Sequence, residues 1–342
     1  MMDQFFSNIL VFLLLRWLVF VYNLLKFPRL KPMPTPENPK VSILIPARNE
    51  AENLKRNLPS VLRQGAFEVL VLDDLSEDET AQVAQEIGKG YPGFRLIRGK
   101  PPPQGWVGKN WACWQLAQEA RGEILVFTDA DVFWEEGALG GLISALEGKD
   151  VISALTRQEG DTAGMLVFLM NGLFSFLPHP ALEALGFANG QVLAFRRDAY
   201  WSIGGHQAVK NEVLEDINIG RRVKKYGLRY RLYLGLDLFR VRMYRNYLET
   251  IQGLGKNFLD IHMKNPAILL GSAYYHLSIY TVPWLFGRWD LGLLGILERA
   301  FVQIALKDRL LPAFFTPIVP ILFLPIYIRA LLPGKTWKGR PV

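Results

Sequence analysis

The feature that most constrains the fold is an alternation of short apolar runs with segments of helical spacing between residues 41 and 132. Apolar runs rich in β-branched residues predict buried parallel strands, and the amphipathic segments between them predict helices. The expected strands are 41–47, 67–74, 94–99 and 122–132, and the expected helices are 48–64, 76–89 and 110–120. Ser76 and Glu79 have the spacing of a capping box at the start of the second helix. This alternation predicts a doubly wound α/β sheet.

Polar residues follow each expected strand. They are Arg48, Asn49 and Glu50 after the first strand, Asp73 and Asp74 at the end of the second, Gly105 to Lys109 after the third, and Asp129 and Asp131 at the end of the fourth. In doubly wound sheets, ligands bind beyond the carboxyl ends of the strands. We therefore expect the functional chemistry at one edge of the sheet.

The acidic pair Asp129 and Asp131 is a candidate metal site. Alternate residues of an extended segment share a face, and two carboxylates on one face can hold Mg²⁺ or Mn²⁺. Such a cation would neutralise a diphosphate leaving group, and the alternative is that the pair caps the following turn. Asp73 and Asp74 could form a second metal pair, read a base, or serve as turn residues. Lys109 stands at an expected helix start, where it could contact phosphate or remain a solvated side chain.

A second acidic pair, Glu215 and Asp216, opens a segment of helical spacing at 216–227. One interpretation is a general base for a hydroxyl nucleophile, and the other is an acidic first turn that interacts with the helix dipole. The sequence has no glycine-rich dinucleotide fingerprint after its first strand and no phosphate-binding P-loop motif. One cysteine excludes a disulfide framework and any zinc site built from several thiolates.

Apolar segments lie at both ends of the chain. Residues 5–25 contain one charge, Arg16, and are long enough to span a bilayer. The basic residues that follow predict an uncleaved anchor whose C-terminal side faces the cytosol, and the alternative is a helix lying flat on the membrane. Residues 266–286 and 311–332 can also span, the latter as a kinked or re-entrant helix because three prolines lie beyond its first turn.

Residues 291–306 are shorter and carry Glu298 and Arg299, so the number of C-terminal spans and the side of the tail stay open. The expected organisation is a membrane anchor at 1–30, a proline-rich linker at 31–40, a cytosolic catalytic domain at 41–262, a C-terminal membrane region of two to three helices at 263–334, and a basic tail at 335–342.

Six segments in order resemble the signatures of family-2 glycosyltransferases. They are VSILIPARNEAENL (41–54), VLVLDDLSEDET (69–80), GWVGKNWACWQL (105–116), ILVFTDADV (124–132), FANGQVLAFRRDAYWSIGGH (187–206) and LEDINIGRRVKKYG (214–227). The resemblance implies an inverting enzyme with the glycosyltransferase A fold, which binds nucleotide-diphosphate sugars. The GWVGKNWAC motif, the C-terminal apolar block and the WKGR tail are most similar to the membrane-bound branch acting on carotenoid or hopanoid lipids.

The resemblance also implies roles for individual residues. On the donor side, the nucleotide pocket would be lined by Pro46, Ala47, Arg48 and Glu50, and Asp73 or Asp74 would contact the base or ribose. Lys109 would approach the pyrophosphate or a neighbouring acid. Asp129 would face the ribose and sugar, and Asp131 would hold the metal. On the acceptor side, Asn189, Gly190, Gln191 and Glu215 would border the acceptor, with Gly204, Gly205 and His206 in a nearby turn. Asp216 would be the base, a role that the resemblance favours over the helix cap.

One departure from the family concerns the QxxRW motif of its processive members, which is missing beyond the base. The segments 241–246 and 252–257 stand there instead, so the transfer of one sugar is favoured over polymerisation. Arg242 and Arg245 could contact the leaving diphosphate or form a basic, membrane-facing surface.

Together these features predict an inverting transferase that moves one sugar from a nucleotide-diphosphate sugar, by family habit a UDP-sugar, with Mg²⁺ or Mn²⁺. The expected acceptor is a hydroxyl or carboxyl of a membrane lipid such as a carotenoid, hopanoid or other polyisoprenoid. The expected location is the inner membrane of a bacterial-type cell. The alternatives are a polysaccharide or polyprenyl-phosphate glycosyltransferase, a nucleotidyltransferase, and a non-catalytic membrane scaffold that keeps the fold. A nucleic-acid partner is not expected, because Lys and Arg cluster at the membrane edges.

Overall fold

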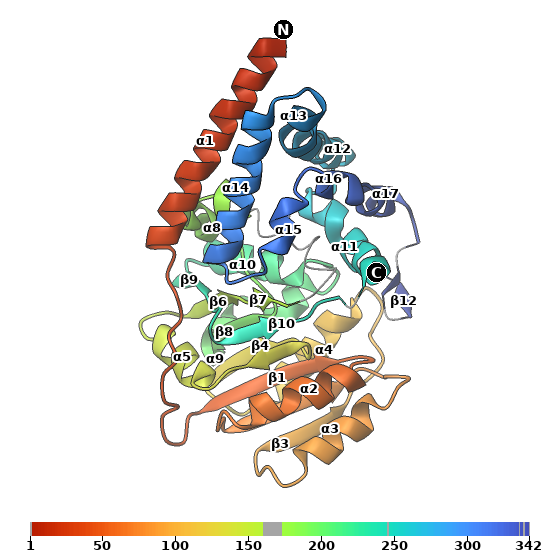
Figure 1. Cartoon of the computed structure of the whole chain (residues 1–342). Helices are drawn as coiled ribbons and strands as arrows, with labels where there is room; N and C mark the ends of the chain where they lie inside the picture. The colour runs from red at the N-terminus through yellow and green to blue at the C-terminus, as the bar shows by residue number, and fades with distance from the viewer. Residues whose placement is uncertain (1, 160–172, 245, 335, 338, 342) are drawn as a thin grey trace. The chain divides into compact units, whose positions relative to one another are not determined.

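The computed structural model describes residues 2–159, 173–244, 246–334, 336–337 and 339–341 (Figure 1). Its packing divides the chain into two compact units. A strand–helix unit comprises residues 28–157 and 180–241, and a helical unit comprises residues 1–27, 158–179 and 242–342. The helical unit is therefore assembled from both ends of the chain and one internal segment.

The strand–helix unit holds all the longer strands. They are β1 (Val41–Ala47), β2 (Glu68–Asp73), β3 (Phe94–Arg98), β4 (Ile124–Thr128), β5 (Val132–Trp134), β6 (Val151–Leu155), β7 (Arg157–Gln158), β8 (Val192–Arg196), β9 (Tyr230–Leu234) and β10 (Phe239–Val241). The helices are α2 (Ala51–Leu62), α3 (Thr80–Gly88), α4 (Gly108–Glu119), α5 (Ala138–Ala145), α8 (His179–Ala184), α9 (Arg197–Ser202), the 3₁₀ turn η1 (Gly205–Val209) and α10 (Glu215–Lys225). Strand β7 and helix α8 straddle the boundary between the units.

The main sheet has the strand order β3-β2-β1-β4-β8-β6-β9. Its first four strands are parallel, as the alternating sequence pattern predicts. The sheet as a whole is mixed, because β8 runs antiparallel to both of its neighbours, β4 and β6. Strands β1 and β2 are almost entirely buried, which is why they appear in the sequence as continuous apolar runs.

The strand order reverses direction between β1 and β4. Right-handed crossovers place α2 and α3 on one face of the sheet, where they pack against each other, and α4 on the other face. The carboxyl ends of β1 and β4 therefore diverge at a topological switch point, where doubly wound sheets open a crevice for ligands. Because β8 is antiparallel, its first residue, Val192, lies opposite Thr128 at the carboxyl end of β4. This pairing brings the segment before β8 to the same edge.

Two local predictions are wrong. Helix α3 begins at Thr80, and Ser76 accepts a hydrogen bond from the backbone N–H of Asn49 (3.0 Å) rather than capping the helix. Asp129 and Asp131 do not share the face of an extended strand, because β4 ends at Thr128 and a turn follows. That turn is closed by a hydrogen bond from the Val132 N–H to the Asp129 carbonyl (3.2 Å), and β5 then pairs antiparallel with β10.

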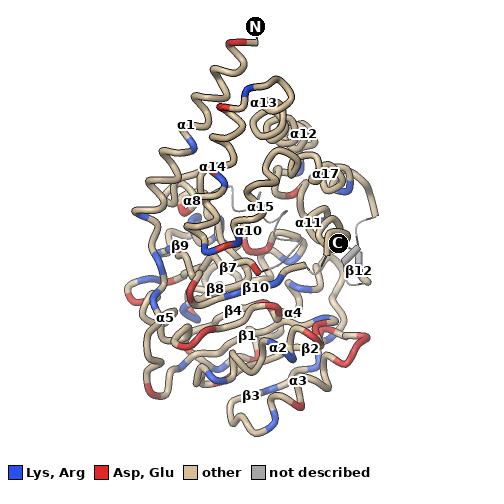
Figure 2. Tube along the Cα trace, viewed as in Figure 1, with Lys and Arg blue, Asp and Glu red and all other residues tan. Residues whose placement is uncertain are grey.

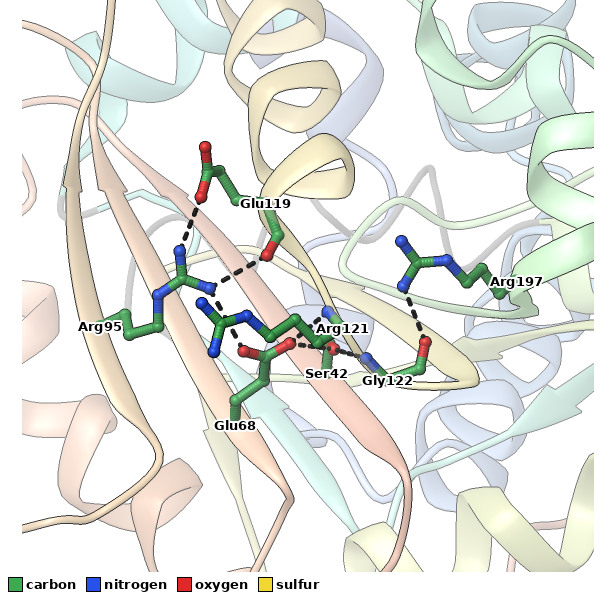
Figure 3. A network of polar contacts seen from close by, with 7 residues as sticks. All are labelled: Ser42, Glu68, Arg95, Glu119, Arg121, Gly122 and Arg197. Carbon is green, nitrogen blue, oxygen red and sulfur yellow. Dashed lines mark hydrogen bonds and ion pairs between the residues drawn. The ribbon is translucent and has the colours of Figure 1, made fainter.

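The amino ends of β1 and β2 are joined by a polar network (Figure 3). Buried Glu68 accepts hydrogen bonds from the Ser42 hydroxyl (2.6 Å) and the Arg121 N–H (2.5 Å). Arg95 reaches Glu68 (3.4 Å) and pairs with Glu119 (2.6 Å). These contacts satisfy a buried carboxylate at the edge opposite the strands' carboxyl ends, so this network is part of the scaffold.

The helical unit carries few charges along its longer helices (Figure 2). Its elements are α1 (Met2–Lys26), α7 (Leu173–Phe176), α11 (Tyr247–Ile261), α12 (Pro266–His276), the π-turn η2 (Leu277–Thr281), α13 (Val282–Leu285), α14 (Trp289–Ala305), α15 (Leu311–Phe314), α16 (Val319–Leu322), α17 (Leu324–Leu331) and the pair β11 (Thr336–Trp337) and β12 (Arg340–Pro341). The expected helix at 311–332 is broken into three short helices, each with a proline in its first turn.

Two apolar cores hold the helical unit together. In one, α1 packs on η2 and α14 through residues such as Phe6, Leu13 and Leu291. In the other, α11 packs on α17, with Phe258 and Ile326 in its centre. Within the described residues, α1 is the helix long and apolar enough to cross a membrane, and residues 319–331 form a shorter apolar stretch.

One charged cluster is buried within the helical unit. The Arg16 guanidinium pairs with Glu298 (Nη2 to Oε1, 2.9 Å), and both side chains are at most 5% exposed. Arg16 also donates to the Ser175 hydroxyl (2.6 Å) and the Tyr275 hydroxyl (3.1 Å), while Tyr280 donates to Glu298 (3.2 Å). This cluster explains why Arg16 is tolerated in an apolar helix: its charge is paired and hydrogen-bonded.

Candidate functional site

A pocket lies in the strand–helix unit at the switch point of the sheet. It is lined by Pro46, Lys109, Cys113, Phe127, Thr128, Asp129, Gly190, Leu193, His206, Glu215, Asp216 and Ile219. These residues come from the carboxyl ends of β1 and β4, from α4, from the start of β8, and from η1 and α10. The pocket is therefore where the sequence pattern predicts the functional chemistry.

Lys109 connects two sides of the pocket. Its ammonium lies 2.9 Å from Asp129 Oδ1 and 2.8 Å from Glu215 Oε1. Asn110, the next residue, fixes the helix start by donating to the carbonyls of Val209 (2.8 Å) and Glu212 (2.9 Å). The first turn of α4 is therefore held against the segment that leads into α10, and Lys109 bridges the acids at the ends of β4 and α10.

Asp216 is held by backbone donors. Its Oδ2 accepts a hydrogen bond from the Gly190 N–H (2.9 Å), and its Oδ1 accepts one from the Ile217 N–H (2.8 Å). A Cβ at position 190 would stand 3.2 Å from the Asp216 Cβ, so glycine lets the segment before β8 approach this closely. These two backbone donors orient the carboxylate in the pocket.

The charged groups of the pocket perturb one another. Burial raises the pKa of Asp216, and neighbouring Glu215 raises it further, to about 6, although Lys109 acts in the opposite direction. Burial alone would lower the pKa of the Lys109 ammonium, but Asp129 and Glu215 raise it well above its ordinary value. Lys109 is therefore a permanent cation, whereas Asp216 changes charge close to neutral pH, as a general base should.

His206 forms an uncharged wall of the pocket. Its ring packs on Phe127 (centroids 4.7 Å apart), and its Nδ1 lies 2.9 Å from the Tyr200 hydroxyl. Burial, with the charge of Lys109, lowers the pKa of His206 to about 3, so the ring is neutral at pH 7. Gly205 is tightly packed against the Tyr200 ring and has a positive φ of 47°, which accounts for the glycine at that turn.

Two other predicted acceptor-side residues, Asn189 and Gln191, hold the segment before β8 in place. Asn189 donates to the Ala154 carbonyl (3.0 Å), and the Gln191 amide oxygen accepts a hydrogen bond from Thr156 (2.5 Å). Both contacts tie the segment before β8 to β6 and the residue that follows it. Gly190 is the member of this group that lines the pocket.

The predicted nucleotide-side residues gather at the carboxyl ends of β1 and β2, where Ala47 and Asp73 are paired in register. Arg48 donates to the carbonyls of Asp74 (2.9 Å) and Leu75 (2.5 Å). Asp73 accepts a hydrogen bond from the Ser76 N–H (3.2 Å). Glu50, also in this group, accepts one from Asn53 (2.6 Å), and Pro46 is the member that lines the pocket.

The turn that holds Asp129 and Asp131 is the candidate metal site. Two carboxylates in one turn are hard oxygen donors, which suit Mg²⁺ or Mn²⁺ when phosphate and water supply the other ligands. Across the described parts of the chain, no group of three or more His, Cys, Asp or Glu side chains is placed to hold a metal ion. With phosphate oxygens and water as the other ligands, the two carboxylates would fit a cation shared with a phosphate-bearing ligand.

The two arginines predicted to contact the diphosphate are not among the described residues that line the pocket. Arg242 belongs to the helical unit, and Arg245 lies outside the described residues. Conversely, sequence reasoning missed Asn110, Tyr200 and Cys113. Asn110 could have been suspected because it is a polar residue next to Lys109 at the expected helix start. Tyr200 and Cys113 give no signal in the sequence that separates them from core residues.

Comparisons with known proteins identify a glycosyltransferase domain in the chain. Residues 42–204 match the family model described as Glycosyl transferase family 2. Curated relatives include 4,4'-diaponeurosporenoate glycosyltransferases from Staphylococcus haemolyticus (strain JCSC1435), 26% identical over 261 residues, and Staphylococcus aureus (strain USA300), 29% identical over 262 residues. Each match covers 72% of this chain and 66% of the relative, which is slightly less than two thirds of its length.

A solved structure shares the fold. The mannosyltransferase PcManGT from Pyrobaculum calidifontis, determined in complex with GDP-Man and Mn²⁺, aligns with a TM-score of 0.57 and 21% sequence identity, covering 96% of each chain. This likeness shows that the strand–helix unit has the glycosyltransferase A type of α/β fold.

Proposed function

Because this chain carries a domain of glycosyl transferase family 2 at residues 42–204, we propose that it transfers one sugar from a nucleotide-diphosphate sugar to a membrane lipid with inversion at the anomeric carbon. The observation that carries the proposal is the pocket at the switch point. There an oriented, partly buried carboxylate, Asp216, lies beside a lysine that pairs with both Asp129 and Glu215.

In this proposal Asp216 is the general base. It takes the proton of an acceptor hydroxyl at a carboxylate oxygen, and the acceptor oxygen forms a bond to the anomeric carbon. The bond from that carbon to the diphosphate oxygen breaks on the opposite face, and the nucleoside diphosphate leaves with both electrons. A pKa of about 6 suits this role, because the base is ionised at pH 7 yet still basic enough to accept the proton.

Donor binding is assigned to the other residues of the edge. Lys109 would contact the diphosphate. The nucleotide would be surrounded by Pro46, Ala47, Arg48, Glu50, Asp73 and Asp74. Asp129 and Asp131 would hold Mg²⁺ or Mn²⁺, which when bound neutralises charge on the leaving diphosphate. The Mn²⁺ and GDP-Man bound to PcManGT support a divalent cation and a nucleotide-sugar donor as the ligands to test. We retain a UDP-sugar as the first donor to test, with GDP-mannose beside it.

A lipid acceptor and a membrane location complete the proposal. Helix α1 is long and apolar enough to cross a bilayer, and the named activity of the curated relatives concerns a carotenoid acid. We propose an integral membrane protein whose catalytic domain, residues 41–262, faces the cytosol, with its anchor at 1–30 and its C-terminal membrane region at 263–334. The acceptor would be a carotenoid, hopanoid or other polyisoprenoid lipid.

A donor screen tests the proposal. Detergent-purified full-length protein is incubated with UDP-, GDP- and dTDP-sugars, each with Mn²⁺, Mg²⁺ or EDTA, and with a crude lipid extract. We expect nucleoside diphosphate release with one donor, dependence on the metal, and sugar label in the lipid phase. Folded protein that neither binds nor turns over any donor would overturn the proposal in favour of a scaffold. Release of pyrophosphate instead would indicate a nucleotidyltransferase.

A further inference from the structure

We propose that His206 is a substrate-binding residue: Tyr200 fixes its imidazole as a neutral Nε2–H donor, which bonds an oxygen of the substrate held beside Asp216. The inference rests on the proposed function and adds one contact to it. It follows from the hydrogen bonds of a buried tyrosine and from the groups that line the pocket.

The Tyr200 hydroxyl determines which nitrogen of the His206 ring carries the proton. Tyr200 is fully buried, and its hydroxyl oxygen accepts a hydrogen bond from the His206 backbone N–H (3.1 Å). The same oxygen lies 2.9 Å from His206 Nδ1, and among the described residues it has no other partner. If Nδ1 carried the proton, the hydroxyl would accept twice and its own proton would be buried without an acceptor, which is costly. The hydroxyl therefore donates to Nδ1, and the proton of the neutral ring is on Nε2.

Both groups keep these protonation states at neutral pH. Burial, together with the charge of Lys109, lowers the pKa of His206 to about 3, so the ring carries one proton. Burial raises the pKa of the Tyr200 hydroxyl well above its ordinary value, so the hydroxyl remains a donor. The turn at Gly205 keeps the two side chains together, because its φ of 47° and its close packing on the Tyr200 ring leave no room for a side chain there.

The Nε2 atom of His206 is open to the pocket. The ring presents its Nδ1 edge to Tyr200, and the two nitrogens of an imidazole point in different directions, so Nε2 points away from that hydroxyl. No hydrogen bond to Nε2 is found within the described parts of the chain, and Nε2 is not among their buried side-chain atoms that lack a partner. Because His206 is 3% exposed and lines the pocket, the accessible Nε2–H meets the pocket.

The other strong donors among the side chains that line the pocket are engaged by the protein. The Lys109 ammonium pairs with two carboxylates, at 2.9 and 2.8 Å. The Thr128 hydroxyl donates to the Gln191 carbonyl (2.8 Å). Carboxylate oxygens, which make up most of the remaining polar surface of the pocket, accept hydrogen bonds and do not donate them. A substrate oxygen beside Asp216 therefore meets, in His206, a donor that no described protein group occupies.

A neutral donor suits this position. A charged imidazolium would lower the pKa of the nearby Asp216 and so weaken it as a base, whereas a neutral N–H bonds an oxygen without supplying a charge. Two oxygens of the reaction have the matching chemistry. One is a hydroxyl of the transferred sugar, which can accept from His206 while it donates to a carboxylate. The other belongs to the hydroxyl or carboxyl group of the acceptor.

Nitrogen-15 magnetic resonance tests the tautomer. The chain has four histidines, so full-length protein with labelled histidine gives few ring signals. Single substitutions of the other three histidines assign those of His206 by elimination. At pH 7 we expect Nε2 to be protonated and Nδ1 to be unprotonated. A ring that is protonated at Nδ1, or at both nitrogens, would overturn the inference.

Binding measurements show which oxygen His206 bonds. His206→Phe keeps a ring on Phe127 and removes the donor, whereas His206→Gln supplies an N–H at a similar reach. If the partner is a sugar hydroxyl, His206→Phe should bind the nucleotide sugar found by the screen roughly three- to tenfold more weakly, with unchanged affinity for the nucleoside diphosphate alone. If the partner is the acceptor, donor affinity should stay unchanged and kcat/KM for the acceptor should fall by a similar factor. In either case His206→Gln should recover part of the loss.

The matched control is His262→Phe, because His262 belongs to the helical unit and does not line the pocket. Its donor affinity and kcat/KM should equal those of wild type. Wild-type values for folded His206→Phe in both arms would overturn the inference and leave the transferase intact. Equal weakening towards the nucleotide sugar and the nucleoside diphosphate would also overturn it, because that result indicates a structural role.

The tautomer separates this inference from the proposed function, because it can be measured whether or not the protein turns over a donor. If neither variant of His206 folds, as judged by circular dichroism, the wild-type tautomer decides the matter. Wild-type protein that binds and turns over no donor would instead contradict the proposed function.

Discussion

Two regions of the molecule hold a basic side chain between acidic or polar partners, and they do so to different ends. In the pocket of the strand–helix unit, half-exposed Lys109 bridges Asp129 and Glu215, and a third acid, Asp216, remains beside the pair. In the helical unit, buried Arg16 meets Glu298, and hydroxyl groups complete its hydrogen bonds.

The difference teaches how to separate a working charge cluster from a structural one. The helical cluster is closed: Arg16, Glu298 and neighbouring Arg299 are nearly inaccessible, and the Arg16–Glu298 pair links α1 to α14. The pocket cluster is open to ligands, and its carboxylate Asp216 has a pKa that burial and Glu215 raise to about 6. Removing charge from the pocket should therefore change activity more than stability, and the reverse should hold for the helical cluster.

The largest expected effect concerns the pocket. Asp216→Asn removes the proposed base, so the rate of sugar transfer to an alcohol should fall by roughly 10²–10⁴-fold. Donor affinity and the melting temperature should stay close to those of wild type, because the amide oxygen can keep an N–H bond. Turnover by nucleoside diphosphate release and donor titration by calorimetry measure both. Wild-type turnover in this variant would remove Asp216 from catalysis.

Substitutions in the buried charge cluster of the helical unit should lower the stability of the protein. Glu298→Met removes the carboxylate that lies beside two buried guanidinium groups, Arg16 and Arg299, and should destabilise the protein by about 3–5 kcal/mol. Arg16→Met should destabilise it less, because Glu298 then still has Arg299 beside it. Melting temperatures of the purified protein in one detergent provide the measurement. If the single variants melt like wild type, the pair is not the link between α1 and α14 that its burial indicates.

The sequence predicts those parts of the fold and the site that depend on strand direction, and it predicts less well the contacts between residues far apart in the chain. The parallel strands and the edge with the acids were predictable, because strand polarity alone brings the ends of β1, β2 and β4 together. Local geometry was less secure. The capping box at Ser76 failed because tertiary partners on the loop after β1 took its hydroxyl. The face-sharing argument for Asp129 and Asp131 failed because the strand stops one residue before them.

The sequence pattern could not predict which acids pair with Lys109 and Arg16, because these partners are far apart in the chain. Lys109 was predicted to approach either a pyrophosphate or a neighbouring acid, and only the fold identifies the acids as Asp129 and Glu215. In the sequence, Arg16 is the one charge of the expected anchor, and Glu298 is one of two charges that left the span at 291–306 open. They are 282 residues apart, and no periodicity in a single chain reveals that one neutralises the other.

A third prediction sharpens the pocket side of the comparison. Asp131→Ala removes one of two proposed oxygen ligands and should weaken metal-dependent donor binding by about tenfold or more, without a matching loss of thermal stability. Donor titrations at several Mn²⁺ concentrations measure it. Glu147→Gln serves as the charge control, because Glu147 is exposed and does not line the pocket. The same donor affinity as wild type across the metal series would exclude Asp131 as a ligand.

The smallest effect is a shift along the pH axis, and it tests whether the pocket charges are coupled as described. With an alcohol acceptor, kcat/KM should rise as pH increases through about 6, because Asp216 must lose its proton before it can act as the base. Glu215 raises the pKa of Asp216, so Glu215→Gln should move this limb to lower pH. Lys109 lowers that pKa, so Lys109→Met should move the limb to higher pH. Shifts of opposite sign require that Asp216 senses both charges, whereas a common shift or none would mean that the limb belongs to another group.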